Sequence, residues 1–174
     1  MGVLLLSIII VALLLIFFLL NFYRDPERKI PKGNNIVSPA DGKIIQILKI
    51  KQNKASNKIK INKGFMGKIE TLTRDVAKEC YIISIFMSPF DVHINRAPIE
   101  GKIESIKHEK GKFFAAFNFK KSLMNEKNEI IIKNKKIGKI KLIQIAGFLA
   151  RRIVCTVSKD KKVNKGQRIG KIVL

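Results

Sequence analysis

Residues 163–172 read Val-Asn-Lys-Gly-Gln-Arg-Ile-Gly-Lys-Ile, and this stretch carries the pattern that decides the fold. Its Asn-Lys-Gly is a tight-turn sequence, because glycine reaches positive φ without steric cost. The residues that follow form a short β-rich run that contains Ile169 and Ile172, which is typical of a β-strand. The triplet Gly-Lys-Ile also occurs at Gly42, Gly67, Gly101 and Gly138, usually where an apolar run begins. The pattern predicts a domain of many short strands, each begun by a tight turn.

Other apolar runs after residue 36 continue this pattern. Each run is short and lies between Gly, Asn, Pro or Lys residues, and no long stretch has the period of an amphipathic helix. Residues 66–76 are interpreted as a short helix or a loop. The predicted strands are residues 42–50, 59–61, 81–87, 91–95, 101–108, 129–133, 139–146, 152–158 and 168–173.

Residues 163–172 resemble the turn-and-strand signature of the barrel-sandwich hybrids found in biotinyl and lipoyl domains. The resemblance implies a mainly β, barrel-sandwich-hybrid-like domain of short strands. The chain lacks the Met-flanked lysine of a biotin or lipoyl carrier, which counts against a carrier function.

Length and composition indicate one domain with a strongly basic surface. The chain has 174 residues, and its hydrophobic content of 47% excludes a disordered protein. Lys and Arg number 35 against 13 Asp and Glu, which gives a formal net charge of +22. Cys80 and Cys155 do not have the spacing of a zinc motif, so no metal site is predicted. The lysines are scattered singly without an aromatic platform, so nucleic acid is not an expected partner.

The most apolar segment lies at the N-terminus. Residues 3–20 are apolar except for Ser7, and about 20 such residues cross a hydrocarbon core of roughly 30 Å as a helix. A cleaved signal peptide is the alternative, but no basic segment precedes the run and no small-residue cleavage site follows it. Arg24, Arg28 and Lys29 follow directly, which places the rest of the chain in the cytoplasm by the positive-inside rule. We expect a single-pass protein of the cell membrane with a transmembrane anchor at 1–23, a linker at 24–36 and a domain at 37–174.

Few side chains can move a proton near neutral pH, because the chain has only two histidines. His93 lies between Pro89 and Pro98, and an extended backbone would place it on one face with Asp91 and Asn95. This acid, imidazole and amide could orient a substrate or transfer a proton. The same alternation also describes an inert, half-exposed strand, so the pattern alone leaves both interpretations open.

The other candidates each have a simple structural alternative. His108 lies in a turn-rich stretch among charges, and Asp41 in Pro-Ala-Asp-Gly is an ordinary turn former. Arg96 adds a fixed cation close to His93 in the sequence. Arg151-Arg152 either is a solvated pair or binds a carboxylate or phosphate group.

Eight segments in series resemble one known family. They include Tyr-Arg-Asp-Pro-Glu-Arg, Val-Ser-Pro-Ala-Asp-Gly, Phe-Met-Ser-Pro-Phe-Asp-Val-His-Ile-Asn-Arg-Ala-Pro and Ala-Arg-Arg-Ile-Val-Cys. In order, the segments are residues 23–28, 37–42, 86–98, 111–113, 125–128, 144–147, 150–155 and 165–170. Together they are similar to the short, archaeal and bacterial type of phosphatidylserine decarboxylase, from Tyr23 to the last residue.

The resemblance implies a reaction, a cofactor and partners. A proenzyme of this family cuts itself at a Gly-Ser bond, and the serine that begins the small α chain becomes a covalent pyruvoyl group. That group is the electron sink for decarboxylation of phosphatidylserine, or of archaetidylserine in archaeal members. No serine here matches the precursor, so the cut is expected immediately C-terminal to Leu174 and this chain corresponds to the β chain. The implied partners are the α chain, the serine phospholipid and the membrane, and a homo-oligomer stays open.

The resemblance also implies roles for single residues. Asp41 matches an aspartate that helps self-cleavage in longer members, and His93 matches a histidine expected near the pyruvoyl group. Arg96 stands where longer members have a second histidine, so their Asp-His-Ser relay does not transfer whole, and His108 is the candidate substitute base. The expected substrate-binding residues are Arg96, Arg151 and Arg152.

Two other classes of function compete with this reading. A non-enzymatic, membrane-anchored adaptor with a barrel-sandwich-hybrid domain is the alternative, although such adaptors normally carry a heptad hairpin that this sequence lacks. An anchored nucleic-acid binder is the third, and it would require strongly salt-dependent binding.

Overall fold

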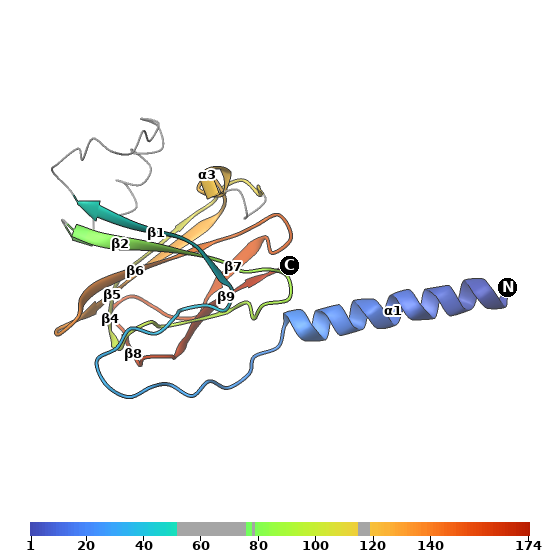
Figure 1. The fold of residues 1–174 in the computed structure, drawn as a ribbon, viewed down its shortest axis with the longest axis horizontal. Coiled ribbons are helices and arrows are strands. Elements are labelled where there is room, and N and C mark those ends of the chain that lie inside the picture. Colours follow the sequence, from blue (N-terminus) through green and yellow to red (C-terminus); the bar gives the residue numbers. More distant parts are fainter. Residues whose placement is uncertain (52–75, 78, 115–118) are drawn as a thin grey trace.

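The computed structural model describes residues 1–51, 76–77, 79–114 and 119–174, in which one apolar helix projects from a mainly β domain (Figure 1). The prediction of a mainly β domain with an N-terminal apolar helix is confirmed. The helices are α1 (Gly2–Phe22) and the short α3 (Phe119–Ser122). The strands are β1 (Lys43–Lys51), β2 (Glu79–Phe86), β3 (Ile94–Arg96), β4 (Gly101–Glu109), β5 (Lys127–Asn134), β6 (Gly138–Ile145), β7 (Arg152–Cys155), β8 (Lys162–Val163) and β9 (Arg168–Val173).

The strands form antiparallel sheets in the orders β1-β2, β3-β9-β7 and β6-β5-β4-β8. In the second sheet, Asn95 of β3 lies opposite Gly170, and Arg152 of β7 lies opposite Val173. Because β3 and β7 both run antiparallel to β9, the beginnings of these two strands flank the end of β9. This register sets the position of the candidate site.

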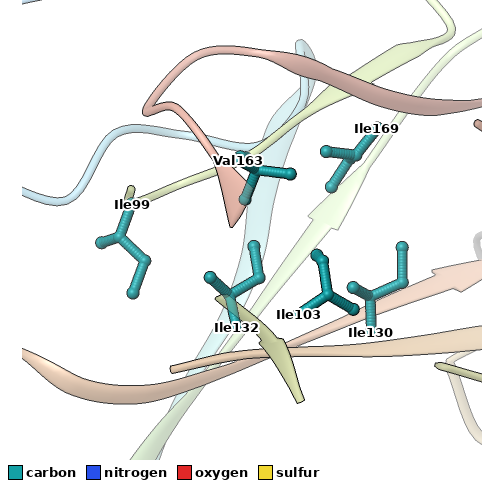
Figure 2. Packing of buried hydrophobic residues seen from close by; sticks show 7 residues of the cluster. Ile99, Ile103, Ile130, Ile132, Val163 and Ile169 are labelled. Carbon is teal, nitrogen blue, oxygen red and sulfur yellow. The ribbon is translucent and has the colours of Figure 1, made fainter. Parts of the chain in front are cut away.

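The hydrophobic core lies between the four-stranded and three-stranded sheets. Ile103, Ile130 and Ile132 of the former pack with Ile169 of β9 (Figure 2). Each of these four side chains is fully buried, which contributes about 1.5–3 kcal/mol per side chain relative to exposure. The core therefore holds β9 firmly against the larger sheet.

Most predicted strands are confirmed to within a few residues at each end. The prediction for 152–158 is too long, because β7 ends at Cys155. The strand predicted at 91–95 is wrong over its first three residues, since β3 begins at Ile94. The Asp91 backbone N–H donates to the Ser88 carbonyl at 3.0 Å, and the Asp91 carboxylate accepts from the Ser88 N–H at 2.7 Å. These bonds close a turn, so the predicted alternation of faces fails there and Val92 and His93 are both buried. The strand predicted at 59–61 and all but the last residue of the segment interpreted at 66–76 lie outside the described residues.

Helix α1 is long and apolar enough to cross a bilayer, a test that an anchor and a signal sequence both pass. Its side chains are exposed along most of its length, and only Phe22 at its end is buried. An exposed apolar surface of this extent is typical of a segment that contacts a membrane or another apolar partner.

Candidate functional site

Hydrogen bonds on both sides hold the end of β9. The Ile172 N–H donates to the His93 carbonyl at 3.1 Å, and the Arg151 N–H donates to the Val173 carbonyl at 2.8 Å. The structure therefore brings together His93, Arg151 and the position expected for chain cleavage, although they lie far apart in sequence.

The imidazole of His93 is buried, with 5% of the residue exposed. Its Nδ1 lies 2.9 Å from the Asp91 carbonyl oxygen, which can only accept a hydrogen bond, so Nδ1 carries the proton. Burial lowers the pKa of His93; the Asp91 carbonyl and carboxylate oppose this shift, and Arg24 adds to it. The ring is therefore neutral at physiological pH, with its lone pair on Nε2. Such a nitrogen can accept a proton or a hydrogen bond.

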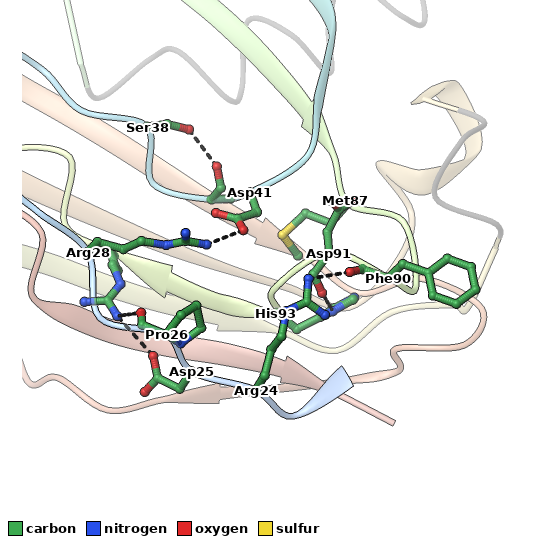
Figure 3. A network of polar contacts seen from close by, with 12 residues as sticks. Arg24, Asp25, Pro26, Arg28, Ser38, Asp41, Met87, Phe90, Asp91 and His93 are labelled. Atoms are coloured by element: carbon green, nitrogen blue, oxygen red, sulfur yellow. Dashed lines mark hydrogen bonds and ion pairs between the residues drawn. The ribbon is translucent and has the colours of Figure 1, made fainter. Parts of the chain in front are cut away.

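Asp41 and Arg96 are both held by the segment that follows α1. The Arg28 guanidinium binds the Asp41 carboxylate at 2.5 Å (Figure 3). Arg96 binds Asp25 at 3.0 Å. Arg96 also donates to the carbonyls of Pro26 and Gly166, each at 3.1 Å. The predicted substrate-binding guanidinium of Arg96 thus has three protein partners.

A third arginine strengthens this docking. Arg168 of β9 binds both Asp25 and Glu27, and these two carboxylates raise its pKa. Arg24 donates to the Phe90 carbonyl at 2.6 Å. The segment after α1 is therefore bonded to the domain, and it holds the end of α1 close to the site.

Asp41 lies on a segment that is hydrogen-bonded to β3. The Arg96 N–H donates to the Pro39 carbonyl at 2.9 Å, which sets the Pro-Ala-Asp-Gly segment along that strand. Within the described ranges, the structure records no hydrogen bond or ion pair between Asp41 and His93. Asp41 is partly exposed and turned to Arg28.

Two other predicted residues, His108 and Arg152, lie beside Glu126, which sequence reasoning missed. Its carboxylate is 6% exposed and lies 3.3 Å from Arg152 Nη1 and 3.4 Å from His108 Nε2. The Ile153 N–H also donates to it at 3.3 Å. The signal was the presence of Glu126 within the recognised 125–128 motif, but an acid on its own in a sequence does not reveal its partners.

Phe113 supports both arginines of the predicted pair. The Arg151 guanidinium carbon lies 4.5 Å from the centre of the Phe113 ring, and that of Arg152 lies 5.7 Å from it. These cation–π contacts limit the movement of both charges. His108, Arg151 and Arg152 thus form one group, and Arg151 connects it to the end of β9.

A row of buried amides, also missed from the sequence, connects the two larger sheets. Asn128 Nδ2 donates to Gln144 Oε1 at 2.9 Å, and Gln144 Nε2 donates to Asn95 Oδ1 at 2.9 Å. Asn128 Oδ1 is buried without a partner among the described residues. A Cβ on Gly170 would lie 2.9 Å from Gln144 Nε2 and 2.7 Å from the Val154 carbonyl oxygen. Only glycine fits there, so the amides approach the β9 backbone closely.

Known proteins are similar in sequence to this chain over most of its length. Residues 15–174 match the sequence profile of the family described as Phosphatidylserine decarboxylase. The "Putative archaetidylserine decarboxylase proenzyme" of Methanocaldococcus jannaschii is 43% identical over 160 residues, 90% of this chain and 74% of that protein. The phosphatidylserine decarboxylase proenzyme of Chlorobium phaeobacteroides is 42% identical over 156 residues, 89% of this chain. That of Chlorobaculum tepidum is 40% identical over 158 residues, 90% of this chain. The chain spans 63% of each bacterial relative, less than two thirds of its length.

Proposed function

Because the chain belongs to the phosphatidylserine decarboxylase family, we propose that it is the larger part of an enzyme that decarboxylates a serine phospholipid. The names of the relatives give two candidate substrates, phosphatidylserine and archaetidylserine, which share the serine headgroup. The observation that carries the proposal is the bonding of the end of β9 to His93 and Arg151.

The chemistry around the end of β9 suits a pyruvoyl group made from a serine C-terminal to Leu174, on an α chain. His93, whose carbonyl accepts from the Ile172 N–H of this strand, is a buried neutral histidine, and Gly170 fixes the strand against the buried amides. A pyruvoyl group supplies an electron-withdrawing ketone that binds the substrate amine and accepts the electron pair left by CO2.

The residues of this chain then have separate roles. His93 Nε2 holds or transfers a proton at the substrate, since Nδ1 is occupied by the Asp91 carbonyl. Asp41 assists self-cleavage, with His108 as the candidate base. Arg151 and Arg152 bind the substrate phosphate or carboxylate. Arg96 keeps a structural role in this proposal, because it lies opposite Arg168 at the beginning of β9 and is held by Asp25, Pro26 and Gly166. Glu126 orients Arg152.

The proposal includes the location and the organisation of the chain. Residues 1–23 anchor the protein in the cell membrane, 24–36 connect the anchor to the domain, and 37–174 form a barrel-sandwich-hybrid-like domain on the cytoplasmic side. A lipid with two acyl or ether chains stays in the bilayer, so the site must lie close to its surface. The basic surface of the protein attracts an anionic substrate.

Reductive trapping tests this function. The native protein is incubated with phosphatidylserine vesicles and sodium cyanoborohydride, and the mass of each polypeptide is measured. We expect a lipid adduct on a small chain that begins with a pyruvoyl group, and none on residues 1–174. A native protein without a pyruvoyl group and without an adduct would overturn the proposal and favour a membrane adaptor.

A further inference from the structure

Two turns lie at the end of β9. The first contains Phe90 and precedes β3, and its closing bond joins the Asp91 N–H to the Ser88 carbonyl. The second contains Phe148 and precedes β7. There the Gly147 N–H donates to the Ala150 carbonyl at 2.7 Å. Because β3 and β7 both begin beside the end of β9, these turns flank the candidate site.

Helix α1 leaves the domain at the same end. Phe22, its last residue, stacks on His93, and Arg24 donates to the carbonyl of Phe90 itself. Figure 1 shows the C-terminus at the end of the domain from which α1 projects. A bilayer crossed by α1 would therefore lie directly opposite the two turns.

Large apolar side chains are exposed on both turns. Phe148 is 70% exposed, Phe90 66% and Leu149 46%. The second turn is followed at once by Arg151 and Arg152, which are exposed and cationic. Apolar side chains beside basic ones are typical of surfaces that lie in the interface of an anionic bilayer. Each nearby cation adds about 1 kcal/mol of attraction to such a surface.

We propose that Phe90, Phe148 and Leu149 form a membrane-contacting surface, which enters the headgroup layer of the bilayer that α1 spans. The occupant is an anionic lipid surface, because the patch is continuous with the anchor through the contact between Arg24 and Phe90. This inference rests on the proposed anchor. Its consequence is that the end of β9 faces the depth at which lipid headgroups lie, so a lipid substrate reaches the site without leaving the bilayer.

Single tryptophans test this surface, because the chain contains none. Phe90→Trp and Phe148→Trp are prepared in the full chain and placed in phosphatidylcholine vesicles containing phosphatidylglycerol. Brominated lipids quench tryptophan either near the headgroups or deep in the bilayer. Tyr81→Trp is the matched control, since Tyr81 is 65% exposed on β2, and β2 begins far from α1 (Figure 1). Leu13→Trp reports on the anchor.

We expect shallow quenching and a blue shift for Phe90→Trp and Phe148→Trp, deep quenching for Leu13→Trp, and neither effect for Tyr81→Trp. Turn variants that are quenched no more than Tyr81→Trp, while Leu13→Trp is quenched deeply, would overturn the surface and leave the anchor intact. Loss of deep quenching at Leu13→Trp would overturn both. Reductive trapping reports on the decarboxylase activity separately, so failure of the enzyme is distinguishable from failure of the surface.

Discussion

The ring of Phe22 stacks on the imidazole of His93, with ring centroids 4.1 Å apart and 26° between the planes. Phe22 is the last residue of α1 and is 1% exposed, although most of that helix is exposed. The last residue of the apolar helix therefore covers one face of the His93 ring. This contact keeps water from one face of His93 and couples the position of the helix to the site.

Removing the Phe22 ring should raise the pKa of His93. Phe22→Ala admits water to the imidazole, and burial is the largest cause of the lowered pKa. The His93 ring resonance in an NMR titration measures this pKa, and His108→Gln identifies which of the two histidines is seen. Phe17→Ala, on the exposed part of α1, is the control. An unchanged His93 pKa in folded Phe22→Ala would show that the stacking does not shield the ring.

His93→Ala should lower the turnover of the serine phospholipid by a factor on the order of 10²–10⁴, the usual contribution of a general acid or base. The measurement is release of CO2 by the processed enzyme, with circular dichroism to check the fold. Lys102→Ala, which breaks an exposed pair with Asp160, is the control and should keep normal turnover. Normal turnover in His93→Ala would remove the histidine from the reaction.

Arg151→Ala and Arg152→Ala should weaken use of the anionic substrate. A charge-assisted hydrogen bond contributes about 1.5–3 kcal/mol, so kcat/KM should fall roughly ten- to hundredfold, mainly through KM. Arg151→Lys keeps the charge and should recover part of the loss. The assay uses mixed micelles of detergent and serine phospholipid. If KM stays constant in both alanine variants, neither guanidinium binds the substrate.

Gln144→Leu should destabilise the domain. The substitution leaves Asn95 Oδ1 and Asn128 Nδ2 buried without their present partner, at a cost of about 1–3 kcal/mol for each group. Thermal unfolding followed by circular dichroism measures the effect. Gln167→Leu is the matched control, since Gln167 is exposed and its side chain accepts from the Asn164 N–H in a surface turn. Equal melting temperatures for the two variants would contradict a structural role of the amide row.

Glu109 should contribute to stability in acid. Hydrogen bonds from Lys107 and Lys127 lower the pKa of Glu109 from 4.5 to about 2. Between these pH values the unfolded chain binds more protons than the folded one, so the stabilisation is complete above pH 4.5 and disappears as the pH falls through about 2. The free energy of unfolding of Glu109→Gln should therefore fall less steeply with decreasing pH in this range than that of the wild type. Chemical unfolding at each pH measures it. Glu100→Gln, on an exposed side chain, is the control, and equal slopes for Glu109→Gln and wild type would contradict the prediction.

Local patterns allowed most of the strands to be predicted. Short apolar, β-branched runs between turn residues depend only on neighbouring residues, so β5 and β9 could be recognised from their own sequences. The segment around Asp91 alternates apolar and polar residues as a strand does, but the Asp91 carboxylate bonds to the Ser88 N–H and closes a turn instead. A side chain that competes for backbone hydrogen bonds is not visible in hydropathy alone.

The sequence allowed several residues of the candidate site to be predicted from their type, but it did not show which residues they contact. Histidine and paired arginines are unusual enough to single out His93, Arg151 and Arg152. Glu126 was missed because a carboxylate is common, and its role depends on His108 and Arg152 reaching it from other strands.

By itself, the sequence determined an apolar helix, a series of short strands and the series of motifs that marks the family. These properties are local, because hydropathy and turn chemistry act over a few neighbouring residues. Only the tertiary structure decided that Phe22 covers His93, and that the end of β9 lies between His93 and Arg151. Such contacts depend on strand register and sheet order, which arise from the packing of the whole domain.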